Sequence, residues 1–112
     1  FTMPDPNLAQ ISPEQLKARI DSGSVPFILD VRNPDEFALA RIPNSQLIPL
    51  GDLPARLAEL DPDKELVVHC KMGGRATQAQ VFLLQHGFKD VKNLTGGILA
   101  WSEKVDPSVA KY

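Results

Sequence analysis

The only cysteine of this 112-residue chain, Cys70, lies where a short apolar run ends and a helical pattern begins. Residues 65–69 are mainly apolar and β-branched, which is typical of a buried strand, and residues 75–86 place apolar side chains near one face of a predicted helix. Residues 70–74 are therefore predicted to form a tight turn between them. A cysteine at the start of a helix is well placed to react as a thiolate, which is the nucleophilic form of the side chain.

The residues after Cys70 carry groups that stabilise an anion. The predicted anion-binding loop consists of Lys71, Met72, Gly73, Gly74 and Arg75. The glycine pair can adopt left-handed backbone angles and turn successive N–H groups inward. The positive end of the following helix points to the same place, and Lys71 and Arg75 add two cations. We therefore expect Cys70 to be substantially ionised at neutral pH.

A lone cysteine can instead pack as a small hydrophobic residue, which is the usual role of an intracellular cysteine. A glycine pair and two cations directly beside Cys70 disfavour that structural role. The sequence around Cys70 favours a catalytic thiolate.

Three further segments combine with the loop into one family pattern. They are Leu29-Asp30-Val31-Arg32 with Glu36-Phe37, then Ile42-Pro43 with Ile48-Pro49-Leu50, and finally Asn93-Leu94-Thr95-Gly96-Gly97 with Ala100-Trp101. Together with the loop and the preceding Val67-Val68-His69 they span about residues 11–102, and in order and spacing they resemble the rhodanese-type sulfurtransferases. Ala40-Arg41 and Asn44 depart from the family pattern, but Asn44 tolerates left-handed angles and can replace a turn glycine.

The end of the chain resembles a subgroup of that family. Residues 97–102, followed by 105–109 and Tyr112, are similar to the C-terminal rhodanese domain of two-domain adenylyltransferase/sulfurtransferase proteins. In those proteins an ATP-using domain activates a ubiquitin-like sulfur carrier, and the rhodanese domain supplies the sulfur. This chain shows no ATP-binding motif, and Phe1 and Thr2 precede any methionine. We therefore expect a fragment of a larger protein, with an adenylyltransferase domain possible on the same native chain.

The resemblance implies a two-step transfer of a sulfane sulfur. Cys70 attacks the outer sulfur of thiosulfate or of a desulfurase-bound persulfide and becomes a persulfide. A thiophilic acceptor, expected to be a ubiquitin-like sulfur carrier protein, then removes that sulfur, which predicts ping-pong kinetics. No cofactor and no metal are expected. Molybdopterin, thiamine, thiolated tRNA and sulfur-containing metabolites are alternative destinations for the sulfur.

Asp30 and Arg32 are the predicted supporting residues, because they follow the apolar strand at the carboxyl edge of the sheet, where such folds collect their sites. The resemblance implies that Asp30 orients a loop cation such as Arg75 and that Arg32 adds positive potential at the mouth of the site. An ordinary ion pair at the strand end is the structural alternative. His69 is expected to point away from Cys70, because side chains alternate along a strand.

Two other functions compete with sulfur transfer. Cell-cycle phosphatases of the same fold also use a cysteine in a strand-to-helix loop, but they place five residues between the cysteine and the arginine, whereas four separate Cys70 from Arg75. The shorter loop between the cysteine and the arginine encloses a smaller space, which suits one sulfur atom better than a tetrahedral oxyanion. The second rival is a non-catalytic rhodanese-like binding module, and the intact cysteine loop argues against it.

The alternation of predicted strands and helices indicates an α/β fold. We expect a rhodanese-like domain with a central, mostly parallel five-stranded sheet and helices on both faces. The predicted helices are 12–22, one starting at 33–34, 53–59, 75–86 and a closing helix, and the predicted strands include 27–31, 46–48, 65–69 and 91–93. Residues 1–112 are expected to form a single domain with loose ends at 1–10 and 103–112.

Composition excludes several other classes. A hydrophobic content of 43% suits one modest core, and a single cysteine cannot form an intrachain disulfide. A net charge of −2 without a basic cluster argues against nucleic-acid binding. The lack of a leader or a long apolar run argues against secretion or membrane insertion, so we expect a cytoplasmic protein. One cysteine and two separated histidines lack the spacing of zinc ligands.

Overall fold

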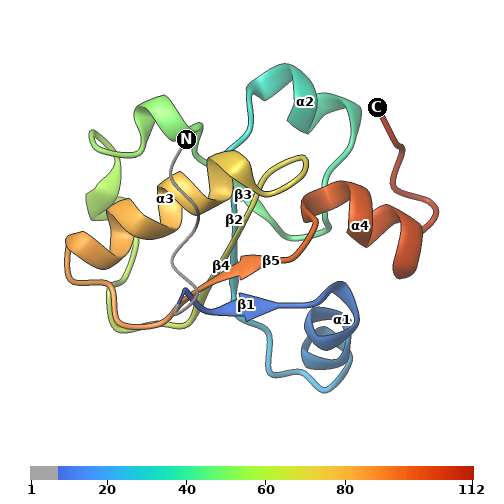
Figure 1. Cartoon of the computed structure of the whole chain (residues 1–112), viewed down its shortest axis with the longest axis horizontal. Coiled ribbons are helices and arrows are strands. Elements are labelled where there is room, and N and C mark those ends of the chain that lie inside the picture. Colours follow the sequence, from blue (N-terminus) through green and yellow to red (C-terminus); the bar gives the residue numbers. More distant parts are fainter. Residues whose placement is uncertain (1–7) are drawn as a thin grey trace.

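A five-stranded parallel sheet forms the centre of the computed structural model, which describes residues 8–112 (Figure 1). The strands are β1 (Gln10–Ile11), β2 (Phe27–Asp30), β3 (Gln46–Leu47), β4 (Leu66–His69) and β5 (Val91–Leu94). Their order across the sheet is β1-β5-β4-β2-β3, and every neighbouring pair is parallel. The predicted α/β class and five-stranded sheet are confirmed.

Helices cover both faces of this sheet. They are α1 (Pro13–Asp21), α2 (Pro34–Leu39), α3 (Gly74–Gln85) and α4 (Gly97–Lys104). Figure 1 shows α3 on the opposite side of the sheet from α1 and α4. Successive strand residues alternate between two cores: Val68 packs in the core beneath α3, whereas Val67 packs in the core formed with α1 and α4.

The start of α1 follows its sequence signal closely. Ser12 Oγ accepts the N–H of Gln15, and the Gln15 side chain accepts the N–H of Ser12. This reciprocal capping box satisfies two N–H groups that have no partner within the helix.

Asn44 has a φ of 66°, so the prediction that it replaces a turn glycine is also confirmed.

The predicted helix 53–59 is wrong. Two short 3-10 helices, η1 (Leu50–Asp52) and η2 (Leu57–Glu59), stand on either side of a turn instead. Pro54 has no N–H and cannot donate an α-helical hydrogen bond to Leu50, so the segment closes through shorter bonds such as Leu53 N–H to Leu50 O.

Both predicted loose ends are ordered where the structure describes them. Gln10 and Ile11 form β1 and pair with Asn93 and Leu94 of β5, whereas residues 1–7 lie outside the described part of the chain. At the other end, Val109 is buried and its carbonyl oxygen accepts the Ser102 hydroxyl. The prediction of a loose segment 103–112 is therefore wrong, because apolar side chains anchor this segment to the core beside α4.

Within residues 8–112, none of the helices combines the length and apolar character needed to cross a membrane.

Candidate active site

Cys70 lies at the base of a loop that joins β4 to α3. Its sulfur accepts the N–H of Gly73 at 3.0 Å and the N–H of Ala76 at 3.4 Å. Gly73 reaches this geometry with a φ of 129°, which is accessible to glycine and strained for other residues. Of the predicted loop, the Gly73 N–H points to the sulfur, and the second donor, Ala76, is the residue after the loop. Both place hydrogen-bond donors where a thiolate or a persulfide would carry negative charge.

The amino end of α4 supports the outer side of this loop. The N–H of Ile98 donates to the Cys70 carbonyl oxygen at 2.9 Å, and the N–H of Leu99 donates to the Lys71 carbonyl oxygen at 3.2 Å. Gly97, at a φ of 63°, passes so close that an added Cβ would lie 2.6 Å from the Cys70 oxygen and nearer still to that of Lys71. The sequence placed Gly97 in a family signature but did not assign it to the site. Two consecutive glycines before a helix were the available signal.

Arg75 is bound by Glu36 and not by Asp30 as predicted. Its two terminal nitrogens donate to the two carboxylate oxygens of Glu36, at 2.6 and 3.0 Å. The hydrogen bond from Arg75, together with those from Tyr112 and the Asn33 N–H, lowers the pKa of Glu36 to about 2 against the opposing effect of burial. The same pair raises the pKa of Arg75, so both groups stay charged at neutral pH. The role predicted for Asp30 therefore belongs to Glu36, which lies 39 residues from Arg75 in sequence.

Asp30 and Arg32 form a buried ion pair at the end of β2. Both side chains are fully buried, and the Arg32 guanidinium donates to both carboxylate oxygens of Asp30. The same guanidinium also donates to the Ala40 carbonyl oxygen at 2.6 Å. Arg32 thus does not face the mouth of the site as predicted, because its charge is paired and enclosed within the fold.

Tyr112 connects that buried pair to the loop cations. Its hydroxyl accepts a hydrogen bond from Arg32 Nη1 at 2.7 Å and donates to Glu36 Oε2 at 2.7 Å. The Lys71 ammonium nitrogen lies 4.6 Å from the centre of the Tyr112 ring, within the range of a cation–π interaction. Sequence reasoning noted Tyr112 as part of a terminal pattern, but no local signal linked it to a loop some forty residues earlier.

His69 is buried beside the Asp30–Arg32 pair. Its Nε2 lies 3.8 Å from Asp30 Oδ2, and its Nδ1 lies 3.5 Å from the Cys70 carbonyl oxygen. Burial lowers the pKa of His69 to about 4, although the nearby Asp30 opposes this effect. These contacts orient the ring toward the interior and away from the sulfur, as predicted, and His69 is neutral at pH 7.

The buried imidazole predicts a specific acid sensitivity. The unfolded chain takes up a proton at His69 near pH 6.5, whereas the folded protein does so only near pH 4, so stability must fall as the pH drops through this window. Between pH 7 and 5 the expected loss is about 2 kcal/mol, since one pKa unit corresponds to about 1.4 kcal/mol. Urea unfolding of the wild type and of His69→Gln at both pH values tests this. A variant that retained the full wild-type loss would contradict the assignment to His69.

A hollow of about 640 Å³ opens beside the loop. Met72, Gly73 and Gly74 line it together with polar side chains of α3, β5 and the turn after β5. The Met72 side chain is 70% exposed. This predicted loop residue therefore presents its side chain to the surface beside the hollow. The hollow gives a second molecule room to approach the loop.

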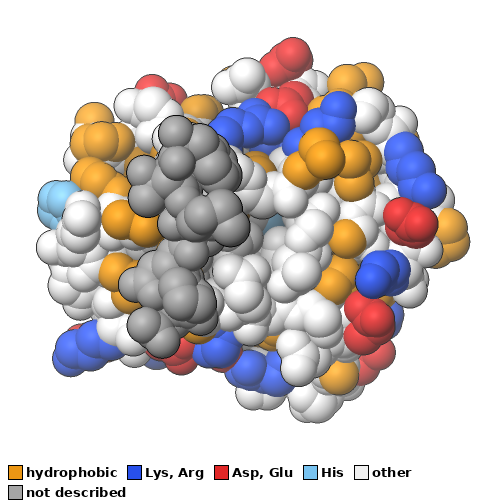
Figure 2. All heavy atoms as spheres, viewed as in Figure 1, with side chains coloured by type: hydrophobic (Ala, Val, Ile, Leu, Met, Phe, Trp, Pro, Cys, Tyr) orange, Lys and Arg blue, Asp and Glu red, His pale blue; other side chains and the backbone are white. Residues whose placement is uncertain are grey.

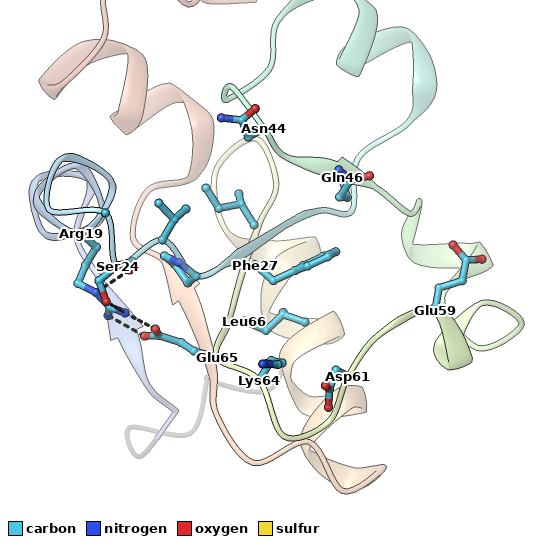
Figure 3. A pocket seen from close by; sticks show the side chains of 14 residues that line it. Arg19, Ser24, Phe27, Asn44, Gln46, Glu59, Asp61, Lys64, Glu65 and Leu66 are labelled. Carbon is cyan, nitrogen blue, oxygen red and sulfur yellow. Dashed lines mark hydrogen bonds and ion pairs between the residues drawn. The ribbon is translucent and has the colours of Figure 1, made fainter.

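A larger hollow of about 710 Å³ lies elsewhere (Figure 3). Phe27 and Leu66, the first residues of β2 and β4, line it, and the Arg19–Glu65 ion pair lies on its wall. Cys70 follows the last residue of β4, so the larger hollow lies at the opposite end of the strands from the sulfur.

Charge on the surface is mixed. On the described part of the face in Figure 2, Lys and Arg side chains lie among Asp and Glu side chains along the top, right and lower edges. Among residues 8–112, no three His, Cys, Asp or Glu side chains are grouped so that they could hold a metal ion.

The fold and the loop define an α/β domain that presents a cysteine at the carboxyl edge of a parallel sheet. The chain belongs to the rhodanese-like domain family, whose family model matches residues 12–104. The predicted family resemblance is thus confirmed.

Individual relatives agree with this assignment. A sulfurtransferase of Allochromatium vinosum is 36% identical over 101 residues, which cover 90% of this chain and 94% of that protein. A probable adenylyltransferase/sulfurtransferase of Mycobacterium tuberculosis, MoeZ, is also 36% identical, over 91% of this chain but only 26% of its own length. The crystal structure of a rhodanese-related protein from Thermoplasma volcanium superposes with a TM-score of 0.80, at 33% identity over 91% of this chain and 97% of that one. The predicted likeness to the rhodanese part of two-domain proteins is confirmed, and the chain spans about a quarter of MoeZ.

Proposed function

We propose that this chain is a sulfurtransferase that carries a sulfane sulfur as a persulfide on Cys70. The observation that carries the proposal is the pair of backbone N–H groups, of Gly73 and Ala76, that donate to the Cys70 sulfur. Such fixed donors stabilise an anionic sulfur without reorganisation, both before and after loading. The relatives named sulfurtransferases support the same chemistry.

The first half-reaction loads the enzyme. The Cys70 thiolate attacks the outer sulfur of the donor, a new sulfur–sulfur bond forms, and the donor's own bond to that sulfur breaks. With thiosulfate, sulfite leaves with the bonding electron pair, and the outer sulfur remains as the negative end of the persulfide. The thiolate is the attacking form, so this step moves no proton, and His69 is turned away from the sulfur.

The second half-reaction unloads the enzyme. A nucleophilic acceptor such as cyanide attacks the outer sulfur, the sulfur–sulfur bond breaks, and the Cys70 thiolate leaves and is stabilised again by Gly73 and Ala76. We propose a ubiquitin-like sulfur carrier, activated as its C-terminal acyl-adenylate, as the biological acceptor. In this case the outer sulfur of the persulfide attacks the acyl carbon and AMP leaves. A thiol reductant then cleaves the sulfur–sulfur bond, which releases the carrier thiocarboxylate and returns Cys70 as a thiolate. The likeness to MoeZ, whose name combines adenylyltransferase and sulfurtransferase, supports this choice. Thiosulfate and a protein persulfide are both compatible donors. An adenylyltransferase domain on the native chain, the cytoplasmic setting and the final destination of the sulfur stay predictions.

The loop geometry favours sulfur transfer over phosphate hydrolysis. Both terminal nitrogens of Arg75 bind Glu36, so the guanidinium does not close a ring of donors around an anion above Cys70. Four residues also separate Cys70 from Arg75, one fewer than the sequence analysis associates with the phosphatases. Hydrolysis of p-nitrophenyl phosphate is accordingly expected to be slower than transfer from thiosulfate.

A single-turnover experiment tests the proposed function. The protein is loaded with thiosulfate, freed of excess donor and divided between cyanide and a ubiquitin-like carrier acyl-adenylate. After this reaction the second portion is treated with a thiol reductant, which cleaves the acyl persulfide and releases the carrier. We expect thiocyanate in the first portion and a carrier thiocarboxylate in the second, each in an amount that matches the loaded Cys70, because one persulfide delivers one sulfur. The Cys70→Ser protein, treated identically, is the control.

The two portions separate the parts of the proposal. Thiocyanate without thiocarboxylate would overturn the carrier as acceptor and leave the sulfurtransferase in place. Neither product, after loading with thiosulfate and with a protein persulfide, would overturn the sulfurtransferase itself.

A further inference from the structure

Tyr112 is held against the active-site loop by the fold of the final segment. Val109 is buried in the core beside α4, and its carbonyl oxygen accepts the Ser102 hydroxyl. Val105 and Tyr112 pack against the same core. The position of Tyr112 is therefore set by several contacts and does not depend on a single hydrogen bond.

The direction of the Tyr112 hydroxyl proton follows from its two neighbours. Arg32 Nη1 and Glu36 Oε2 each lie 2.7 Å from the hydroxyl oxygen. A guanidinium can only donate and a carboxylate can only accept, so the hydroxyl accepts from Arg32 and must donate to Glu36. Because Asp30 fixes the Arg32 guanidinium, the Tyr112 hydroxyl is oriented toward Glu36 before any substrate arrives.

The Glu36 carboxylate is shared between Tyr112 and the loop. Its Oε2 accepts from Tyr112 and from Arg75 Nη2, and its Oε1 accepts from Arg75 Nη1 and from the Asn33 N–H. A carboxylate held by all these donors has little freedom to rotate. Loss of the Tyr112 hydroxyl leaves Oε2 with Arg75 Nη2 as its remaining donor, so the carboxylate that orients Arg75 is held less firmly.

The Tyr112 ring supports the other loop cation directly. The Lys71 ammonium lies 4.6 Å from the ring centre, and the ring otherwise packs on the core beside α4. Lys71 is the residue next to the sulfur-bearing Cys70, so the ring holds this positive charge close to the site.

We propose that Tyr112 is a positioning residue that holds both loop cations, Lys71 directly and Arg75 through Glu36, so that Cys70 prefers anionic reagents. The proposal deepens the proposed function, because it assigns the preference for an anionic sulfur donor to contacts made outside the loop. Tyr112 itself touches no reacting atom.

Selective alkylation tests this without requiring sulfur transfer. The chain has one cysteine, so the rates with iodoacetate, an anion, and with iodoacetamide, its neutral analogue, both report on Cys70. The ratio of the two rate constants measures the local preference for negative charge. We expect Tyr112→Phe, which keeps the ring, to lower this ratio about threefold, and Tyr112→Leu, which loses both contacts, to lower it about tenfold.

Two further variants test whether Tyr112 acts on the loop through Glu36. Lys111→Ala removes a neighbouring exposed cation and is expected to leave the ratio unchanged, which shows that net charge is not the cause. In a Glu36→Gln background, Tyr112→Phe is expected to cause almost no further change, because the hydroxyl acts through Glu36. Thermal unfolding of each variant records any loss of stability separately.

An unchanged ratio in both Tyr112 variants, with a lowered unfolding temperature, would overturn the proposal and leave Tyr112 as a packing residue. A lowered ratio in a protein that fails to load sulfur would support the positioning role and overturn only the proposed function. If wild-type Cys70 reacted with neither reagent, the reactive thiolate itself, and with it both proposals, would be rejected.

Discussion

Replacing Cys70 with serine is expected to abolish sulfur transfer while preserving the fold. A serine hydroxyl stays protonated at neutral pH and cannot form the persulfide, so steady-state transfer from thiosulfate to cyanide should fall by about 10⁴-fold or more. The serine hydroxyl is smaller than the thiol, so it fits the same space and can still accept the N–H of Gly73, which is the nearer of the two donors to the sulfur. The free energy of unfolding, measured in urea, should therefore fall by only about 1 kcal/mol, which is the cost of placing a hydroxyl among apolar neighbours.

The same variant separates an enzyme from a binding module. If Cys70→Ser retained a few per cent of wild-type thiocyanate formation, Cys70 would not be the carrier. If transfer vanished but the cellular function that depends on a partner protein persisted, the domain would act as a scaffold and not as an enzyme.

Replacing Gly97 with alanine is expected to have the second-largest effect. The new Cβ would lie 2.6 Å from the Cys70 carbonyl oxygen and closer to that of Lys71, so the loop or the start of α4 must move. Either movement weakens the bonds from Ile98 and Leu99 that fix the loop from outside. A displacement of about 1 Å can cost about 100-fold in rate, and we expect a loss of transfer of this size.

Gly87→Ala provides the matched control for this variant. Gly87 also has a positive φ, of 86°, but nothing lies within 4 Å of its added Cβ. Backbone strain should lower the free energy of unfolding of both variants by about 1–2 kcal/mol, and the clash should lower that of Gly97→Ala further. Urea unfolding and the thiocyanate assay, applied to both proteins, give the comparison. Equal transfer by the two variants would show that α4 does not position the loop.

Local signals in the sequence predicted the turn that joins β4 to α3. Cys70, the glycines after it and the start of α3 are consecutive, so strand-to-helix patterning was enough to predict a tight turn in which Gly73 directs its N–H toward the sulfur. The N-terminal cap of α1 and the left-handed Asn44 were predictable for the same reason, because each depends on a few neighbouring residues.

The partners of the loop were not predictable in this way. Glu36, Gly97 and Tyr112 approach the loop through the tertiary fold, across separations of 39 residues between Glu36 and Arg75 and 76 between Glu36 and Tyr112. The family resemblance implied Asp30 as the partner of Arg75, but Arg32 lies two residues from Asp30 and pairs with it instead. Charge and position in the sequence do not reveal which of two nearby carboxylates is already paired.

Errors in secondary structure had equally specific causes. Pro54 converted a predicted helix into two 3-10 helices. β1 is only two residues long, too short to produce an alternating pattern, and pairs as an edge strand with β5. The final segment looked loose because Pro107 and nearby polar residues dominate it, while its anchors, Val109 and Tyr112, are isolated.

The central claim, that Cys70 carries sulfur as a persulfide, is tested most directly by intact-protein mass spectrometry. The protein is weighed after incubation with thiosulfate and again after cyanide, with Cys70→Ser in parallel. We predict a gain of one sulfur atom that cyanide removes and that the variant never shows. A gain that persisted in Cys70→Ser, or no gain from either thiosulfate or a protein persulfide donor, would contradict the claim.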